Sequence, residues 1–325
     1  MTLPKRLILL AVALLPLLAV SAAAQESYPT RPIRLLVGFA AGSSGDVAAR
    51  IISHKLGEIL GQSVIVENRP GASSMIATDI VARAQKDGYT LLLATVAATI
   101  NTTLMPGKGA NFEKDLTPIA LVGSIPNILV VNPTVGVNDV KGLIALAKEK
   151  PDLLSYGASG IGSGPQLTAE LFKQMAGVQM TAVLYPGSAQ QVTDLIAGRI
   201  QVMFAPASSV LGFIEQGTVK ALATTQAKRA SIAPNLPTIS EAALPGFDTG
   251  IWFGILAPTD TPAAVIDKVS TATNEALKDA DVLKQLHMQG LDALGGSPDD
   301  FRRFIRSETE RWARVVNAME AAKKK

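Results

Sequence analysis

The chain has 325 residues, of which 48% are hydrophobic and 18% are charged, and its formal net charge is +3. This length allows one large domain or two medium ones, with a sizeable apolar core. Two of the basic residues, Lys5 and Arg6, lie near the start, so the remainder is close to +1 and lacks the basic stripe of nucleic-acid-binding proteins. The chain has no cysteine, which excludes disulfides, thiol catalysis and a lipid-modified cysteine anchor.

The first 24 residues have the layout of a signal peptide. Lys5 and Arg6 precede the apolar run Leu7–Val20, and Ala22–Ala24 supplies the small residues of a cleavage site. An uncleaved membrane anchor is the alternative, but this apolar run is short for a span. We therefore predict cleavage before Gln25 and export to the periplasm.

Strands and helices alternate in the next hundred residues. Apolar runs predict strands, and apolar residues at steps of three and four predict helices. The predicted elements are strand Ile33–Phe39, helix Asp46–Leu60, strand Ser63–Glu67, helix Ser73–Lys86 and strand Thr90–Thr95. This βαβαβ order implies a parallel sheet with right-handed crossovers.

A second α/β unit follows. Its predicted strands are Asn127–Val131, Leu153–Gly157, Thr181–Tyr185, Gln201–Phe204 and Val219–Ala223, and its predicted helices are Asp139–Lys148, Pro165–Met175 and Ala189–Ala197. The chain ends with strand Ile251–Leu256 and helices Pro262–Leu277, Ala280–Met288 and Pro298–Ala322.

The terminal helices have no sheet of their own, so we expect them to pack back on the first unit. The chain would then cross between the units twice, at about Ser124–Asn127 and Glu241–Gly250. We predict an α/β fold with lobe 1 at residues 25–124 plus 240–325 and lobe 2 at residues 125–239. Two crossings imply a hinge, with a ligand cleft between the lobes.

The sequence offers little for catalysis or metal binding. Its two histidines, His54 and His287, fall inside predicted helices, and no H-x-x-H pair or cysteine could hold zinc. No serine lies in G-x-S-x-G, and no phosphate-binding G-x-x-x-x-G-K-[ST] motif occurs. We predict neither a metal nor a cofactor, and no enzymatic activity.

Three loops of Gly, Ser, Ala and Pro each join a strand to a helix, namely Ala40–Gly45, Ala158–Gly164 and Tyr185–Ser188. Open α/β sheets bind ligands at the carboxyl ends of their strands. A helix N-terminus presents free N–H groups to an anion, so the three loops together predict an anion site.

The chain resembles the periplasmic solute-binding proteins of tripartite tricarboxylate transporters, the Bug receptors. The likeness covers nearly all residues after the leader and lies in the blocks Tyr28–Ile33, Val37–Arg50, Val66–Ala72, Asp87–Leu93, Tyr156–Ser163, Leu167–Phe172, Tyr185–Ser188, Asp194–Gly198, Val202–Phe204 and Leu236–Thr238. It implies a type II periplasmic-binding-protein-like (Venus flytrap) fold without catalysis. It also implies that main-chain groups and ordered waters hold a ligand carboxylate in the cleft.

The resemblance places ligand-binding residues in the three loops and near two further strand ends. These residues are Phe39, Ala41, Gly42, Ser43, Ser44, Asp46, Thr95, Ser159, Gly160, Ser163, Tyr185, Pro186, Gly187 and Ala205. The strand-end loop Thr95–Asn101 should also line the cleft.

The sequence departs from the family pattern at four places. In the first loop, Ala40-Ala41 and Ser43 stand where Pro and a second Gly are common. Gln166 stands where a histidine is usual, Ala205 where an aspartate is usual, and Gly71–Met75 reads G-A-S-S-M in place of G-A-G-G-N. These changes leave the grip on a carboxylate intact and alter the part that reads the rest of the ligand. The loss of an acid at Ala205 argues against recognition of a free α-amino group.

Asp46 is an unexpected acid in a loop expected to hold an anion. A carboxylate at a helix entry accepts hydrogen bonds from nearby backbone N–H groups. Our hypothesis is that Asp46 shapes the loop and does not touch the ligand anion, because two close carboxylates repel. A plain helix cap without a ligand role is the alternative.

The leading interpretation is a receptor for a small carboxylate, such as a di- or tricarboxylate, an aromatic acid or a related organic anion. It would be a monomer that delivers its ligand to the membrane subunits of a tripartite tricarboxylate transporter. One alternative is a ligand-sensing receptor for a membrane signalling protein. Another is a hydrolase that uses Ser159 or Ser163, which would need a base within hydrogen-bond reach.

Overall fold

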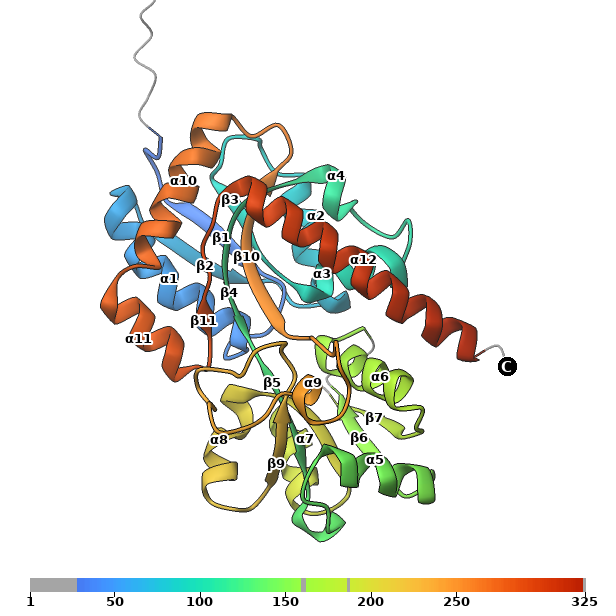
Figure 1. Ribbon diagram of the computed structural model, residues 1–325. Helices are drawn as coiled ribbons and strands as arrows, with labels where there is room; N and C mark the ends of the chain where they lie inside the picture. The colour runs from blue at the N-terminus through green and yellow to red at the C-terminus, as the bar shows by residue number, and fades with distance from the viewer. Residues whose placement is uncertain (1–27, 159–161, 186–187, 324–325) are drawn as a thin grey trace, which may run out of the picture.

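The computed structural model describes residues 28–158, 162–185 and 188–323. Within them the chain forms two mixed β-sheets, one above the other in Figure 1. The signal peptide predicted for residues 1–24 lies outside this range. Among the helices in the described range, none is long and apolar enough to cross a membrane.

The first sheet has the strand order β11-β4-β10-β3-β1-β2. Its strands are β1 (Ile33–Val37), β2 (Val64–Asn68), β3 (Thr90–Thr95), β4 (Leu116–Ile125), β10 (Ile251–Pro258) and β11 (Asp292–Ala293). The first three are parallel, whereas β10 and β4 are antiparallel to their neighbours. All eight residues of β10 are buried, as expected for an apolar strand covered on both faces.

Helices cover both faces of this sheet and reach toward the second one. They are α1 (Ser44–Leu60), α2 (Met75–Ala82), α3 (Val96–Leu104) and α4 (Phe112–Asp115), with the terminal helices α10 (Ala263–Ala276), α11 (Ala280–Met288) and α12 (Pro298–Lys323). Helices α10 and α11 contact α1, and α12 contacts α3 and β4. The same helix α12 also contacts α6 of the second unit, so it joins the two halves (Figure 1).

The second sheet has the strand order β7-β6-β8-β5-β9. Its strands are β5 (Asn127–Val131), β6 (Ser155–Ala158), β7 (Thr181–Leu184), β8 (Val202–Pro206) and β9 (Lys220–Thr224). Its helices are α5 (Val140–Glu149), α6 (Gly164–Ala176), α7 (Ser188–Ile196), α8 (Ala207–Glu215) and α9 (Ile239–Ala242).

The chain passes between the sheets at two adjacent places. Only Pro126 separates β4 of the first sheet from β5 of the second, and residues 225–250 return the chain from β9 to β10. The two passages are hydrogen-bonded to each other, because Gln226 Nε2 donates to Ser124 Oγ at 3.0 Å and Thr225 N donates to Asn127 O at 3.0 Å. These hydrogen bonds hold the two passages together as one compact connection between the units.

Three sequence expectations about local structure are wrong. The helix expected at Ser73–Lys86 spans only Met75–Ala82, after a short 3₁₀ turn at Ala72–Ser74. The segment expected as a loop at Thr95–Asn101 is the N-terminal part of α3, capped by the Thr95 side chain. No strand was predicted at Leu116–Ile125, where the structure has β4.

Candidate functional site

The first glycine-serine turn joins β1 to α1. Gly42 adopts the left-handed backbone (φ 79°), which a residue with a side chain rarely does. Ser43 caps the helix, because its Oγ accepts a hydrogen bond from Asp46 N at 3.3 Å. Ala41 and Gly42 are exposed, and Phe39, Ser43 and Ser44 are half-buried, so solvent reaches this turn.

Asp46 lies beneath this turn with only 3% of its surface exposed. Its carboxylate accepts hydrogen bonds from Gly42 N (2.9 Å), Arg50 Nε (3.1 Å) and Asn68 Nδ2 (2.9 Å). Burial would raise the pKa of Asp46, but these hydrogen bonds and the Arg50 charge outweigh it and hold the pKa below its ordinary value. Asp46 is therefore an ionised brace inside the protein, with its oxygens already bonded.

The second glycine-serine turn has the same construction in the other sheet. Gly162 is left-handed (φ 75°), Ser163 caps α6 by accepting from Gln166 N at 3.3 Å, and Gln166 Oε1 accepts from Gly162 N at 2.6 Å. Gln166 thus has the place that Asp46 has in the first turn, but without a charge. Ser159 and Gly160 lie outside the described residues.

The third loop begins at Tyr185, which is 8% exposed. Its Oη donates to Asp194 Oδ2 at 2.9 Å, and its backbone N donates to Ala158 O at 2.9 Å. Burial and the Asp194 carboxylate raise the pKa of Tyr185 to about 12. Tyr185 therefore ties the ends of β6 and β7 together, while Pro186 and Gly187 lie outside the described residues.

Helix α3 of the first unit lies directly against the second turn. A Cβ placed at Gly162 would be 2.6 Å from Leu104 Cδ2, and one at Gly164 would be 3.1 Å from Val96 Cγ1. Glycine at these positions lets the two units approach closely. Thr95, which is 4% exposed, caps α3 by accepting from Ala97 N at 3.3 Å, so its hydroxyl serves the fold.

Asn101 lies on α3 at the same contact and is 8% exposed. Its Nδ2 donates to Ser73 O at 2.9 Å, which fixes the orientation of the amide. Its Oδ1 has no hydrogen-bond partner in the part of the chain that the structure describes, and it would lie 3.8 Å from a Cβ at Gly162. Asn101 thus offers an acceptor where the two units meet.

The turn at residues 71–74 was not among the predicted ligand-binding residues, although its departure from the family pattern was expected to alter recognition of the rest of the ligand. Ala72, Ser73 and Ser74 all have positive φ (46°, 51° and 75°), which is strained for residues other than glycine. A Cβ at Gly38 would lie 1.9 Å from Ser74 Oγ, so glycine is required beneath this turn. The signal for it was present, because the family pattern has glycine at two of these positions.

Ala205 lies in β8, opposite Ile128 of β5, and has no exposed surface. Its methyl group belongs to the apolar core that extends to the first sheet. The structure thus brings the second turn against helix α3, which Thr95 caps, and places Ala205 beneath the surface.

Comparison with known proteins identifies the family. A family model described as the tripartite tricarboxylate transporter family receptor matches residues 48–321. The chain belongs to this receptor family. BugT of Bordetella pertussis is 36% identical over 293 residues, which are 90% of each chain. A protein from the tcbD-tcbE intergenic region of Pseudomonas sp. strain P51 is 35% identical over 292 residues, 90% of this chain and 87% of that one.

Solved structures of receptors share this fold. Rpa4515 of R. palustris with adipate has a TM-score of 0.82 at 36% identity, covering 89% of this chain and 97% of that one. MatC from Rhodopseudomonas palustris with bound malate has a TM-score of 0.79 at 29% identity, covering 89% and 100%. The family resemblance and the two-unit α/β fold of a periplasmic binding protein are thereby confirmed, and this chain is a solute-binding receptor.

Proposed function

We propose that this receptor is exported to the periplasm and binds a small carboxylate between its two sheets, for delivery to tripartite tricarboxylate transporter membrane subunits. The observation that carries the proposal is the pair of matched glycine-serine turns at the N-termini of α1 and α6. Each turn leaves first-turn N–H groups without a partner inside the helix and adds the positive end of the helix dipole. The relatives with adipate and malate support a carboxylate as the ligand.

The proposed ligand contacts come from the three loops. They are Phe39, Ala41, Gly42, Ser43, Ser44 and Ser163, together with Ser159, Gly160, Pro186 and Gly187. Asp46, Thr95 and Tyr185 would position these loops, because their polar side-chain atoms are bonded to protein groups. We add Asn101 as an acceptor for a ligand group or a bridging water.

We further propose that the two units are lobes of a monomer that close on the ligand. The sequence predicts their boundaries at residues 25–124 plus 240–325 and residues 125–239, after removal of residues 1–24. Because α9 (Ile239–Ala242) packs with α5 and β9 of the second sheet, we propose that the second lobe extends past α9 toward β10. The close approach of Gly162 to Leu104 supports a closed arrangement. A ligand that touches both lobes favours this arrangement over an open one.

The described residues give the hydrolase alternative no support. The Oγ of Ser163 accepts from the Gln166 backbone N, and His54 lies on the surface beside Glu58. A Ser, a His and an Asp do meet at Ser231, His287 and Asp292, but the Ser231 hydroxyl donates to Asp292, so no acid orients the histidine. In a catalytic triad the serine bonds to the histidine and the histidine bonds to the acid, and this cluster does not have that arrangement.

Thermal unfolding against a panel of acids tests the proposal. The mature chain should first be unfolded and refolded to remove carried ligand, then heated with mono-, di- and tricarboxylates, aromatic acids and amino acids. A ligand at about a hundredfold its Kd adds about 2.7 kcal/mol. This raises the unfolding temperature of a chain of this size by several degrees. If no acid raises the unfolding temperature, the carboxylate assignment is wrong.

A pair of glycine variants locates the binding. Gly162→Val puts a branched side chain where Leu104 approaches, whereas Gly177→Val strains a left-handed glycine (φ 62°) with open space around it. Gly162→Val should weaken acid binding by about tenfold or more, since about 1.4 kcal/mol of strain in the closed form is enough. If Gly162→Val and Gly177→Val bind the acid with equal affinity, the ligand does not bind beside Gly162.

A further inference from the structure

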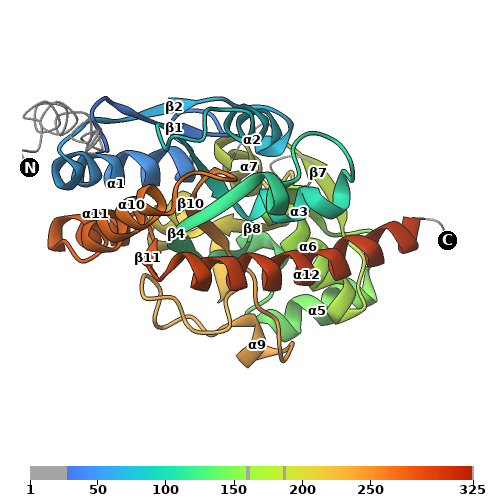
Figure 2. The ribbon, with the colours of Figure 1, turned by 90° about the horizontal axis from the view of Figure 1, so that it is seen from above.

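A cavity lies on the face of the molecule that carries α12 and α9 (Figure 2). It has a volume of about 800 Å³ and lies between α6 of the second unit, α12 of the first and the connecting residues 246–248. Figures 1 and 2 show α12 and α9 on one side of β4 and β10, and β1, β2 and β7 on the other. None of the residues that line this cavity, here named the hinge-side pocket, belongs to the proposed carboxylate site.

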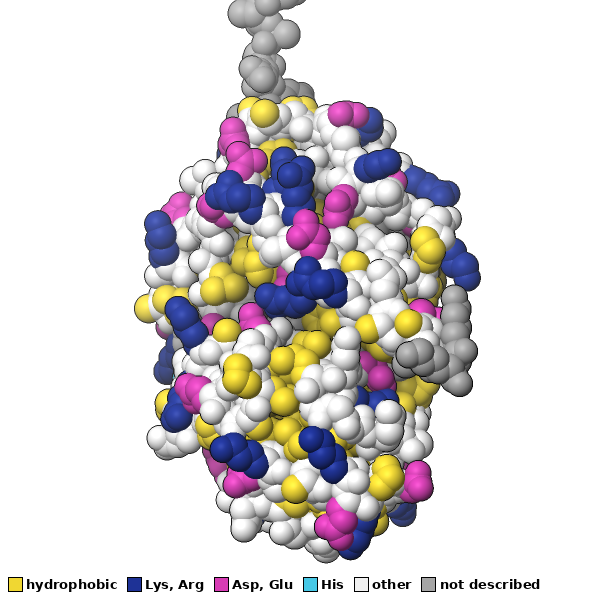
Figure 3. All heavy atoms as spheres, turned by 45° about the vertical axis from the view of Figure 1, so that its right-hand side comes forward, with side chains coloured by type: hydrophobic (Ala, Val, Ile, Leu, Met, Phe, Trp, Pro, Cys, Tyr) yellow, Lys and Arg dark blue, Asp and Glu magenta, His cyan; other side chains and the backbone are white. Residues whose placement is uncertain are grey.

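Much of the wall of the hinge-side pocket is apolar. Leu171 and Met175 of α6, Phe247 of the connection and Val315 of α12 contribute hydrophobic side chains. On the face drawn in Figure 3, hydrophobic side chains gather in a band between the two units, with Lys or Arg side chains above them. Small-molecule sites combine such a wall with a few polar groups.

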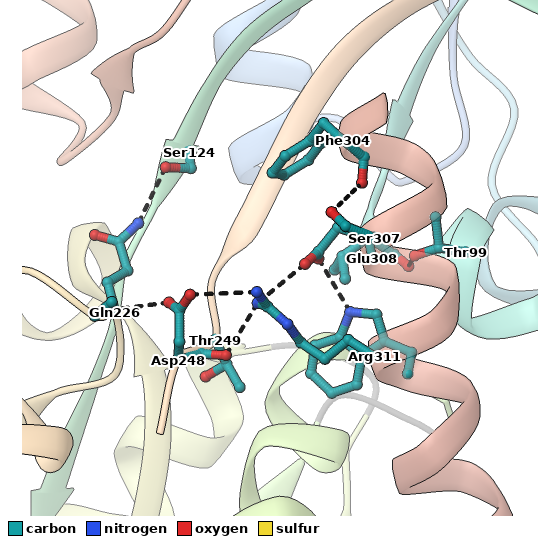
Figure 4. Close-up of polar contacts among 12 residues, drawn as sticks. Thr99, Ser124, Gln226, Asp248, Thr249, Phe304, Ser307, Glu308 and Arg311 are labelled. Carbon is teal, nitrogen blue, oxygen red and sulfur yellow. Dashed lines mark hydrogen bonds and ion pairs between the residues drawn. The ribbon is translucent and has the colours of Figure 1, made fainter. Parts of the chain in front are cut away.

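Two cations of α12 lie at the pocket, and they differ in their bonding. Arg311 is neutralised, because it pairs with Asp248 Oδ2 at 3.3 Å and with Glu308 Oε1 at 3.0 Å (Figure 4). Arg314 is exposed and makes no ion pair or hydrogen bond with the residues that the structure describes. Arg314 is therefore the lining cation that is left free to pair with a ligand acid, because Arg311 is held by two carboxylates.

The opposite wall offers a neutral polar group. Gln174 of α6 lines the pocket and, within the described part of the chain, its amide has no hydrogen-bond partner. A guanidinium on one wall and an amide on the other, over an apolar floor, match a ligand with one acid group and an apolar body. A charged donor binds such an acid through strong, charge-assisted hydrogen bonds.

We propose that the hinge-side pocket is a second ligand site, which binds a small amphipathic monoanion. The apolar body of the ligand lies against Leu171, Phe247 and Val315, and its acid group pairs with Arg314. The pocket is built from both units, so its occupant contacts both. Helix α6 begins at the Ser163 turn and reaches the pocket at Leu171, so it connects the two sites directly.

The probe for this site is 8-anilinonaphthalene-1-sulfonate, a fluorescent monoanion with an apolar body, titrated into the folded mature protein. We expect a single saturable site. Arg314→Gln removes the charge and should weaken binding by about tenfold or more. Met175→Trp, which fills the pocket from a side chain that is 38% exposed, should weaken it to a similar extent.

Arg306→Gln is the matched control, because Arg306 is another exposed arginine of α12 but does not line the pocket. It should bind the probe like the unaltered protein. Unchanged unfolding temperatures would show that all three variants are folded. Probe affinity within twofold of the unaltered protein in both Arg314→Gln and Met175→Trp would overturn the proposal, since the probe would then bind elsewhere.

Discussion

Asp46 and Gln166 show how one side chain distinguishes two otherwise matched turns. Each accepts the N–H of a left-handed glycine four residues earlier, at 2.9 Å and 2.6 Å. Only Asp46 carries a charge, and Arg50 compensates it at 3.0 Å. The acid in the first turn is thus explained by the turn itself and requires no contact with the ligand.

Asp46→Asn tests this explanation. The amide oxygen can still accept from Gly42 N, while the pairing with the half-exposed Arg50 is lost, so we expect a stability loss of about 1 kcal/mol. Acid binding should stay the same or become tighter, because a negative charge near the anion is removed. Calorimetric titration measures the affinity. Loss of binding in a folded variant would show that the ligand needs the Asp46 charge.

The strained turn at residues 72–74 leads to a second residue-scale prediction. Ala72 is exposed and has φ 46°, so its side chain brings strain without packing. Ala72→Gly should raise the unfolding free energy by about 0.5–1 kcal/mol. Ala145→Gly, at an exposed position inside α5, should lower it by about 1 kcal/mol. Urea unfolding compares them, and a loss of stability in both variants would show that the turn is unstrained.

Among the elements, β1 and β2 are linked by an ion pair that predicts acid sensitivity. Arg34 Nε lies 2.7 Å from Glu67 Oε1, and this contact lowers the pKa of Glu67 to about 2. A carboxylate with a lowered folded pKa stabilises the fold above its unfolded pKa and loses this effect as the pH falls through the folded pKa. The stabilisation should therefore fade between about pH 4.5 and about pH 2.

Glu67→Gln should remove this part of the acid dependence. The side chain of Arg34 is 42% exposed, so water screens the pair, and we expect a loss of about 1 kcal/mol at neutral pH, well below what the full pKa shift would suggest. Urea unfolding at neutral and acid pH measures both quantities. Two parallel stability curves for Glu67→Gln and the unaltered chain would contradict the prediction.

The strands that the sequence predicted well are those with unbroken apolar runs. Residues Ile33–Val37 and Thr90–Thr95 are almost entirely buried, so hydrophobicity alone identifies them. Strand β4 was missed because Pro118 and Gly123 interrupt its run. Gly123 is explained only by tertiary structure, since a Cβ there would lie 2.4 Å from Asp292 O of β11.

At the scale of the whole molecule, the turns at the site could be predicted, but the contacts between the units could not. Glycine and serine after a strand indicate an anion site through local geometry. Asp248 pairs with Arg311, which lies 63 positions later in the chain. Hydrophobic periodicity in the sequence does not predict such a long-range pair. The hinge-side pocket was missed for the same reason, because its walls come from three separate parts of the chain.

Substitution of Arg311 should destabilise the contact between the two units. It bonds the connecting segment through Asp248 O at 3.1 Å and also lies beside Glu308, which is 3% exposed and accepts from Trp312 Nε1 at 3.2 Å. Burial raises the pKa of Glu308, although Arg311 and Trp312 counteract it, and the Asp248 charge adds to the rise. Without Arg311, Glu308 would be a buried acid without a cation.

Arg311→Gln should therefore lower the unfolding free energy by about 3 kcal/mol at neutral pH. An acid with a raised folded pKa destabilises the fold when ionised, and this effect disappears as the pH falls below its unfolded pKa. The loss should be larger at about pH 8 than at about pH 5.

Asp248→Asn keeps Arg311 beside Glu308 and should cost about 1 kcal/mol without this pH trend. Urea unfolding at the two pH values measures the unfolding free energy of both variants. If Arg311→Gln loses the same free energy at both pH values, the charge of Glu308 does not depend on Arg311.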